Sequence, residues 1–303
     1  MSDLSVSFAG VEFKNPVITA SGTFGFGREY GEYFDLNKLG GICVKGLTLR
    51  PRDGNPPPRI AETPMGILNS VGLQNPGVDA FIVRELPFLK QYDTKIIANI
   101  SGNTEDEYAE MAGKLSVAGV DLIEVNISCP NVKAGGLTFG TDWASAASVT
   151  QAVKEASNVP VMVKLSPNVT DIAEIAKACE GEGADALSLI NTLLGMRIDI
   201  DTCRPILKNN VGGLSGPAVF PVAVRMVWQV AQAVKIPILG MGGISDSRDA
   251  VEMMMAGASL VAIGTSMFRD PLTPVKVLEG IEDFLENKSI DSIAEIIKKV
   301  KIY

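Results

Sequence analysis

Eight short apolar runs recur along the chain, each followed by a segment with a helical pattern, and this alternation constrains the fold more than any other feature. Several runs are apolar without alternation, as parallel strands buried on both faces should be. Strands that alternate with helices predict βαβ units and a parallel sheet. The eight runs are Pro16–Ala20, Ile42–Lys45, Lys95–Ile100, Leu122–Ile127, Pro160–Leu165, Ala186–Ile190, Pro237–Leu239 and Leu260–Ile263.

Eight such units in 303 residues favour an α/β fold of the TIM (β/α)8 barrel type, with a doubly wound sheet as the alternative. We find no linker, repeat or low-complexity tract, so we expect residues 1–303 to form a single barrel domain. Val6–Phe8 and Val11–Phe13 flank Ala9-Gly10 ahead of the first run and predict a small N-terminal β-hairpin that closes the barrel bottom. Among the helices, Thr170 is expected to cap one over Asp171–Glu180.

Three connections are long, and long ordered loops in a barrel usually build the active site. They are Gly46–Asn75, Pro130–Thr141 and Thr192–Pro217.

The charge balance restricts the partners. A formal net charge of -8 repels phosphate backbones and anionic membranes, so we expect no nucleic-acid and no membrane partner. The longest uncharged stretch, Met253–Phe268, contains two glycines and is short for a membrane span. The N-terminal residues lack a basic region followed by an apolar one, so we expect a cytoplasmic protein without a signal peptide.

Cysteine and histidine usage narrows the chemistry. None of the 4 cysteines forms a C-x-x-C pair, so we expect neither a metal nor an iron–sulfur site in this chain. There are 0 histidines, so proton transfer must use Cys, Lys, Tyr, Asp or Glu. Cys43 and Cys203 have no assigned role, and Cys179 is expected in the core.

Every predicted strand ends in a polar residue or a glycine, and in a TIM barrel these ends meet at the active site. Lysines stabilise developing negative charge, while amides suit imide and carboxylate edges. The last two strands end in Gly-Gly and Gly-Thr, which suit a phosphate group. No G-x-G-x-x-G follows a strand at the start of a βαβ unit, so a mononucleotide such as FMN fits better than a dinucleotide. The strand ends are Ser21-Gly22, Lys45-Gly46, Asn99, Asn126, Lys164, Asn191-Thr192, Gly242-Gly243 and Gly264-Thr265.

Two segments carry a resemblance to a known family. Asn126–Val132 (NISCPNV) resembles the active-site segment of dihydroorotate dehydrogenases, and Asn69–Gly77 resembles their substrate loop. Further matches are Val163–Pro167, Asn191-Thr192 and Gly213–Gly216. The matches cover nearly the whole chain in the expected order.

The same resemblance indicates the subtype. The membrane-bound class has a serine base and an N-terminal extension, whereas this chain has Cys129 and begins almost at its first strand. Lys133–Gly140 looks like the corresponding loop of the cytosolic NAD-linked class (class 1B) rather than of the fumarate-using class.

The resemblance implies oxidation of dihydroorotate to orotate in de novo pyrimidine (UMP) biosynthesis. Cys129 would take the C5 proton and the flavin N5 the C6 hydride, with Lys164 and Lys45 as further catalytic residues. Since few free thiols are ionised at neutral pH, activity should rise toward alkaline pH. We expect the loop Pro130–Gly140 to act as a lid.

Binding residues carry over by position in the matched motifs. FMN, one per chain, would be held by Ser21, Lys45, Gly46, Asn99, Asn126, Lys164, Ile190, Gly216, Gly242, Gly243, Gly264 and Thr265. The pyrimidine and its carboxylate would be held by Lys45, Asn69, Ser70, Val71, Gly72, Leu73, Asn126, Asn191 and Thr192.

Electrons must then leave the flavin, and the resemblance implies NAD as final acceptor through a partner. The family pattern is a homodimer of the catalytic chain with two electron-transfer subunits that carry FAD and a [2Fe–2S] cluster, together a heterotetramer. The nearest rival is a flavin barrel acting on another pyrimidine, such as dihydrouracil. A rival from another class is a non-redox phosphate-binding barrel, such as an isomerase or aldolase, which would be colourless.

Overall fold

Eight parallel strands close into a barrel in the order β3-β4-β7-β8-β9-β10-β15-β16, with β16 paired back to β3. The structure is a computed structural model and describes residues 2–128 and 140–303. Each barrel strand falls on one of the predicted runs, so the TIM barrel is confirmed and the doubly wound sheet is wrong. The strands are β3 (Val17–Thr19), β4 (Gly41–Cys43), β7 (Lys95–Ile100), β8 (Leu122–Asn126), β9 (Val161–Lys164), β10 (Ala186–Leu189), β15 (Ile238–Met241) and β16 (Leu260–Ile263).

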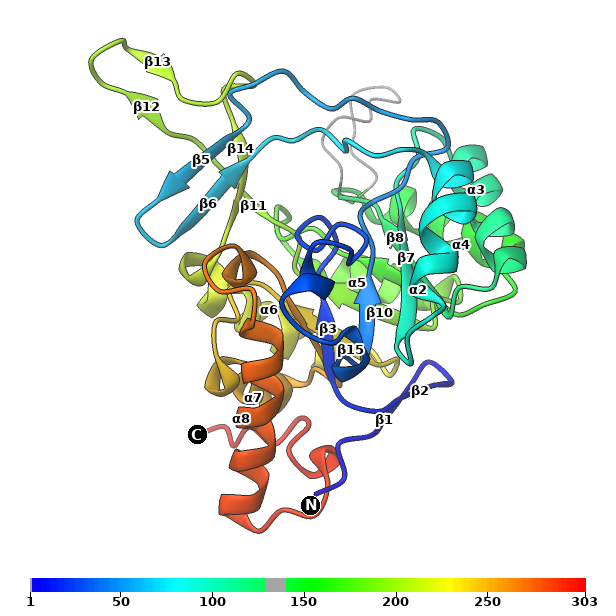
Figure 1. The fold of residues 1–303 in the computed structure, drawn as a ribbon, viewed down its shortest axis with the longest axis vertical. Coiled ribbons are helices and arrows are strands. Elements are labelled where there is room, and N and C mark those ends of the chain that lie inside the picture. Colours follow the sequence, from blue (N-terminus) through cyan, green and yellow to red (C-terminus); the bar gives the residue numbers. More distant parts are fainter. Residues whose placement is uncertain (1, 129–139) are drawn as a thin grey trace.

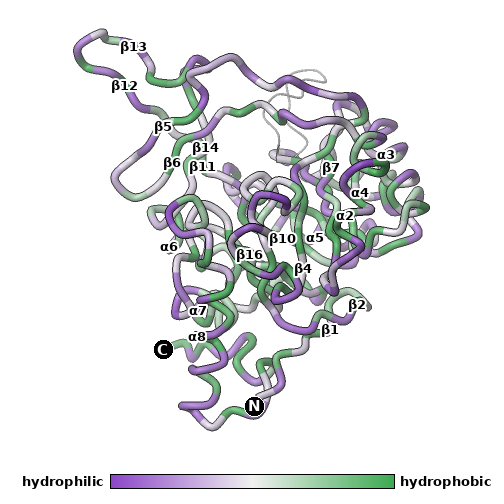
Figure 2. Tube along the Cα trace, viewed as in Figure 1, coloured by the Kyte–Doolittle hydropathy of each residue, from purple (hydrophilic) through white to green (hydrophobic). Residues whose placement is uncertain are grey.

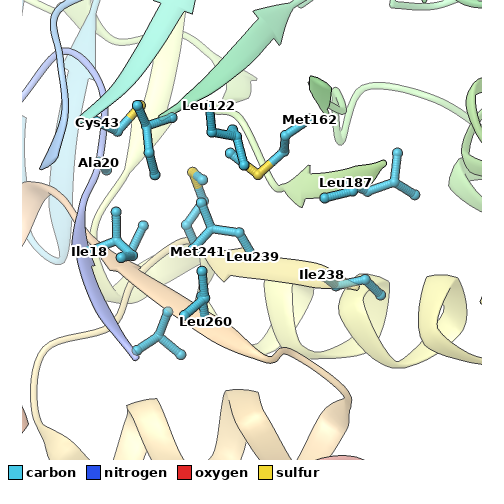
Figure 3. Close-up of a cluster of buried hydrophobic side chains, with 14 of the residues drawn as sticks. Ile18, Ala20, Cys43, Leu122, Met162, Leu187, Ile238, Leu239, Met241 and Leu260 are labelled. Carbon is cyan, nitrogen blue, oxygen red and sulfur yellow. The ribbon is translucent and has the colours of Figure 1, made fainter. Parts of the chain in front are cut away.

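Apolar side chains fill the part of the barrel interior that is distant from the strands' carboxyl ends. Figure 3 shows Ile18, Leu122 and Leu239 from three different strands pointing toward one another, and all three are buried. Because side chains alternate along a strand, the inward residues of β8 are Leu122, Glu124 and Asn126 in order toward the carboxyl end. The lining of the barrel therefore changes from apolar to polar along its axis.

Helices surround the barrel, and four of them, α3, α4, α5 and α7, begin at a capping side chain. Thr104, Asp142 and Asp246 each accept a hydrogen bond from a backbone N–H of the first turn that follows. The cap of α5 is Asp171 and not Thr170, because the helix begins at Ile172 and the Asp171 carboxylate accepts from the N–H of Ala173. The helices are α1 (Val78–Ala80), α2 (Leu86–Leu89), α3 (Glu105–Ala118), α4 (Trp143–Ala156), α5 (Ile172–Gly181), α6 (Phe220–Ala233), α7 (Ser247–Ala256) and α8 (Thr273–Lys288).

Short helical turns complete the ring. A π-helical turn, η3 (Phe81–Glu85), joins α1 to α2, and the 3-10 turns are η1 (Tyr30–Glu32), η2 (Leu36–Lys38), η4 (Pro217–Val219), η5 (Thr265–Phe268) and η6 (Ile293–Glu295). Figure 2 shows hydrophobic and hydrophilic segments alternating along α7 and α8, as amphipathic helices covering a core should. No helix within the described ranges is long and apolar enough to cross a membrane.

Two of the long connections form a second sheet over one side of the barrel mouth (Figure 1). Its strand order is β11-β14-β6-β5, with β5 (Ile60–Thr63) and β6 (Gly66–Asn69) from the first connection and β11 (Leu193–Gly195) and β14 (Gly212–Ser215) from the third. The hairpin β12 (Ile198–Asp199) and β13 (Arg204–Pro205) projects beyond it. These connections thus contain short strands, where only loops were expected.

The predicted N-terminal hairpin is confirmed as β1 (Val6–Phe8) and β2 (Val11–Phe13). Phe8 and Phe13 are each 1% exposed, and a Cβ at Gly41 would lie 3.0 Å from the Phe13 ring. Since Gly41 is the first residue of β4, the hairpin covers the N-terminal end of the barrel. Both chain ends lie at this same end of the molecule (Figure 1).

Candidate active site

A cavity of about 470 Å³ opens at the carboxyl ends of the barrel strands and runs under β6 and β14. Its volume lies within the range of small-molecule sites. Every predicted cofactor or substrate residue within the described ranges lines it, although these residues span positions 21 to 265. They are Ser21, Lys45, Gly46, Asn69, Ser70, Val71, Gly72, Leu73, Asn99, Asn126, Lys164, Ile190, Asn191, Thr192, Gly216, Gly242, Gly243, Gly264 and Thr265.

Cys129, the predicted base, lies outside the described residues, as do residues 130–139 of the predicted lid. The described chain reaches the cavity at Ser128, which lines it. The Ser128 hydroxyl donates to the Lys164 carbonyl at 3.2 Å, and its backbone N–H donates to Asn126 Oδ1 at 3.2 Å. The segment that follows β8 is thus hydrogen-bonded to the end of β9.

The charge of the cavity wall is one-sided. Among the described residues that line it, Lys45 and Lys164 are charged and neither Asp nor Glu is present. This contrasts with the net charge of -8 for the whole chain. The wall therefore favours a ligand that carries phosphate or carboxylate groups.

One end of the cavity is a glycine cradle. Gly242 has a φ of 121° and Gly243 a φ of 81°, in the region that L side chains rarely adopt. A Cβ at Gly243 would lie 2.8 Å from the carbonyl oxygen of Gly216, so only glycine allows the turn after β15 to approach the residue before η4 this closely. Thr265 Oγ1 and Ser215 Oγ, 2.8 Å apart, add hydroxyl groups at the same end. Glycines without side chains and a pair of hydroxyl groups together fit a phosphate group.

Amide side chains form a second part of the wall. Asn191 Nδ2 donates to Asn126 Oδ1 at 3.2 Å, and Asn191 Oδ1 accepts from the Thr192 backbone N–H at 2.8 Å. The Tyr108 hydroxyl donates to the Asn126 carbonyl at 2.7 Å and fixes the end of β8. Two strand ends therefore hold their amides in one network, as recognition of a polar heterocycle requires.

The loop Ser70–Leu73 closes another side. Gly72 and Leu73 both have positive φ, 77° and 55°. Asn55 supports the loop from behind, because its Nδ2 donates to the Ser70 carbonyl at 2.8 Å and its backbone N–H donates to the Val71 carbonyl at 2.9 Å. Ser70 Oγ is buried and has no hydrogen-bond partner in the part of the chain that the structure describes.

Sequence reasoning missed one buried group directly below the cavity, Glu124. Its carboxylate accepts hydrogen bonds from Cys43 Sγ (3.2 Å), Asn99 Nδ2 (2.5 Å) and Ser188 Oγ (2.7 Å) and lies 3.8 Å from Lys164 Nζ. Burial, and then the negative charge of Glu124, raises the pKa of the Cys43 thiol well above its ordinary value. A charged residue inside an otherwise apolar strand was the available signal.

Comparison with known proteins gives the family. The family model described as dihydroorotate dehydrogenase matches residues 3–285. The chain belongs to the dihydroorotate dehydrogenase family. One relative, named dihydroorotate dehydrogenase B (NAD(+)), catalytic subunit, from Alkaliphilus oremlandii, is 60% identical over 98% of this chain and 99% of its own length. A relative of the same name from Thermoanaerobacter sp. is 58% identical over 99% of both chains.

A solved structure supports the fold. The dihydroorotate dehydrogenase of Eimeria tenella superposes with a TM-score of 0.82 over 98% of this chain and 88% of that chain, at 23% identity. The predicted family and NAD-linked class are confirmed by the relatives' names, and the fold by this structure. The contact that each cavity residue makes with cofactor or substrate stays a prediction.

Proposed function

We propose that this chain oxidises dihydroorotate to orotate with FMN bound in the cavity, in de novo pyrimidine biosynthesis. The observation that carries the proposal is the cavity wall. Residues from the barrel strands and from the first and third long connections meet there around two lysines, and no described carboxylate lines it. Orotate is a carboxylate with an imide edge, and FMN carries a phosphate. Both match a cationic wall with amide groups.

The residues present fit FMN. The glycine cradle of Gly242 and Gly243, with the Ser215 and Thr265 hydroxyls, would hold the phosphate. Asn99 Oδ1 is buried without a partner among the described residues, and such an acceptor calls for a donor on the ligand. When bound, FMN would supply the hydride acceptor.

The chain's own residues would do the rest. Dihydroorotate loses a proton from C5 and a hydride from C6, and Cys129 would take the proton. Lys164 and Lys45 would stabilise negative charge in the cavity. Asn69, Asn126, Asn191 and Thr192, with the Ser70–Leu73 loop, would hold the pyrimidine ring and its carboxylate.

Transfer to NAD would need a partner, because no dinucleotide fingerprint is found in the sequence. We propose a homodimer of this chain with two electron-transfer subunits that carry FAD and a [2Fe–2S] cluster. The names of the relatives, which include the words catalytic subunit, support this assembly. We place the assembly in the cytoplasm.

The test is anaerobic mixing of the purified yellow protein with dihydroorotate while flavin absorbance is followed. We expect rapid bleaching by dihydroorotate, none by dihydrouracil, and a loss of several orders of magnitude in Cys129→Ala. A colourless protein, or a flavin that dihydroorotate cannot reduce, would overturn the proposal. Bleaching by dihydrouracil instead would point to a different pyrimidine substrate.

A further inference from the structure

A carboxylate lies at the centre of the barrel, directly below the cavity. Glu124 is 0% exposed and does not line the cavity itself. A buried charge is costly unless it is paired and hydrogen-bonded, so a buried carboxylate at this position indicates a specific role.

The contacts of Glu124 cross the barrel interior. In the sheet, β8 pairs with β7 and β9. The Glu124 carboxylate nevertheless contacts Cys43 on β4 and Ser188 on β10, which it can reach only through the interior. Together with Asn99 on β7 and Lys164 on β9, it joins five strands of the barrel.

This carboxylate determines which end of the Asn99 amide faces the cavity. An ionised carboxylate only accepts hydrogen bonds, so Asn99 must turn its Nδ2 toward Glu124, at 2.5 Å. Asn99 Oδ1 then faces Gly46 on the cavity wall, where a Cβ would lie 2.8 Å from it. That oxygen is buried and has no partner in the described chain, although Asn99 lines the cavity, so an acceptor is left next to the wall at this point.

The same carboxylate sets the charge of the wall. Lys164 has a side chain that is 7% exposed and lies 3.8 Å from Glu124. Charges in a region of low dielectric act strongly over such a distance. The negative charge therefore partly offsets the Lys164 charge that the cavity experiences.

We propose that Glu124 is a positioning residue of the FMN site, which fixes Asn99 as an acceptor toward the cofactor and moderates the positive charge of Lys164. The inference rests on the proposed function, because it assigns this part of the cavity to FMN. It assigns to the flavin a hydrogen-bond donor opposite Asn99 Oδ1.

The variant Glu124→Gln tests both effects with little change in volume. Gln carries an amide nitrogen that donates and an oxygen that accepts, so it can satisfy Ser188, whose hydroxyl also accepts, but it no longer forces the Asn99 amide into one orientation. It also leaves Lys164 without a counter-charge. The affinity for oxidised FMN should fall about tenfold, at a free-energy difference of about 1.4 kcal/mol per tenfold.

The affinity for the reduced cofactor should fall less than that for the oxidised cofactor, or not at all. Reduced FMN gains negative charge, so the uncompensated Lys164 should favour it over oxidised FMN by at least about tenfold relative to wild type. The ratio of the two dissociation constants sets the midpoint potential, which should become more positive. A purely structural role would weaken both states alike and leave the potential unchanged.

The experiment titrates flavin-stripped full-length protein with FMN by fluorescence quenching and measures the midpoint potential of the reconstituted protein. Glu180→Gln is the matched control, because that carboxylate accepts from the backbone N–H groups of Lys235 and Ile236 away from the cavity. Affinity and potential equal to wild type in Glu124→Gln would overturn the inference. If that variant does not fold, Glu124→Asp replaces it, since the shorter side chain cannot keep all its partners and should weaken FMN binding. Wild-type behaviour of Glu124→Asp would then overturn the inference.

Wild type separates the two proposals. Wild-type protein that binds FMN and is bleached by dihydroorotate, alongside an unaffected Glu124→Gln, contradicts the role of Glu124 alone. Wild-type protein that binds no FMN contradicts the proposed function itself.

Discussion

The hydroxyl groups of Thr265 and Ser215 lie 2.8 Å apart and join the turn after the last barrel strand to the last strand of the second sheet. Both residues line the cavity. The contact therefore links the barrel, which supplies the glycine cradle, to the sheet that covers the cavity. Under the proposed function, it would couple cofactor binding to the position of β14.

Replacing Thr265 with valine tests this contact. Thr265→Val keeps the shape of the side chain but removes the hydroxyl from the phosphate end, so FMN affinity should fall about tenfold, the equivalent of one lost hydrogen bond to a charged group. Fluorescence titration of flavin-stripped protein measures it. Thr170→Val, at an exposed position outside the cavity, is the control and should bind FMN as wild type does. Unchanged affinity in Thr265→Val would place the phosphate elsewhere.

The glycine cradle predicts a clear contrast between two glycine substitutions. Gly243→Ala should destabilise the protein by about 2 kcal/mol or more and weaken FMN binding, because its φ is 81° and the new Cβ would lie 2.8 Å from the Gly216 oxygen and the Phe220 backbone nitrogen. Gly181→Ala, in α5 with nothing within 4 Å of its new Cβ, should be neutral or stabilise by up to about 1 kcal/mol. Urea denaturation separates them, and equal stabilities would contradict the cradle.

The support of the Ser70–Leu73 loop predicts a change in KM. Asn55→Ala removes the 2.8 Å hydrogen bond to the Ser70 carbonyl at a residue that does not line the cavity, so the KM for dihydroorotate should rise about tenfold with a smaller change in kcat. Steady-state kinetics with an artificial electron acceptor measures both constants. Asn158→Ala, exposed and outside the cavity, is the control. A fall in kcat alone would contradict a role in substrate binding.

The barrel strands and the cavity residues at their ends could be predicted because their signals are local, whereas Asn69–Leu73 and Gly216 were predicted through the family resemblance. Each buried strand is rich in apolar residues, and the strand ends of a TIM barrel meet at one mouth whatever the loops do. The second sheet could not be predicted in this way. Its β6–β14 pairing joins Asn69 to Gly213, and two short strands so far apart in sequence carry no periodic signal of their own.

Glu124 was missed for a related reason. The strand ends indicate the inward residues at the mouth of the barrel, such as Asn126. Glu124 is the previous inward residue of the same strand and lies deeper in the barrel. Its significance depends on partners from β4, β7, β9 and β10, which only the closed barrel brings together. The α5 cap shows a smaller difference, where two adjacent capping residues, Thr170 and Asp171, were not separable by type alone.

Burial of Cys179 predicts that stability falls at alkaline pH. Burial raises the pKa of the Cys179 thiol from 9.0 to about 11, so the folded state holds this proton more tightly than the unfolded state. The contribution is fully present below pH 9 and is lost as pH rises from 9 toward 11, at about 1.4 kcal/mol per pKa unit. The raised pKa of Cys43 acts in the same direction.

Urea denaturation between pH 8 and about 10.5 checks this prediction. Cys179→Ala should lose packing at neutral pH but show a shallower decline of the unfolding free energy above pH 9. Cys203→Ala, at an exposed position, should keep the wild-type slope. An equally steep decline in Cys179→Ala would assign the alkaline transition to other groups.

The Lys164–Glu124 pair predicts strong coupling between two substitutions. Lys164→Met leaves the Glu124 carboxylate buried without its counter-charge and should lower the unfolding free energy of FMN-free protein by about 3 kcal/mol. Adding Glu124→Gln to Lys164→Met removes the stranded charge and should recover most of that loss, so the double-mutant cycle gives a coupling energy of at least about 1 kcal/mol. A double variant whose loss equals the sum of the two single losses would show that the charges do not interact across their 3.8 Å separation. Recovery of stability without recovery of flavin reduction would separate the two roles of Lys164, since the methionine repacks the barrel but supplies no positive charge to the cavity.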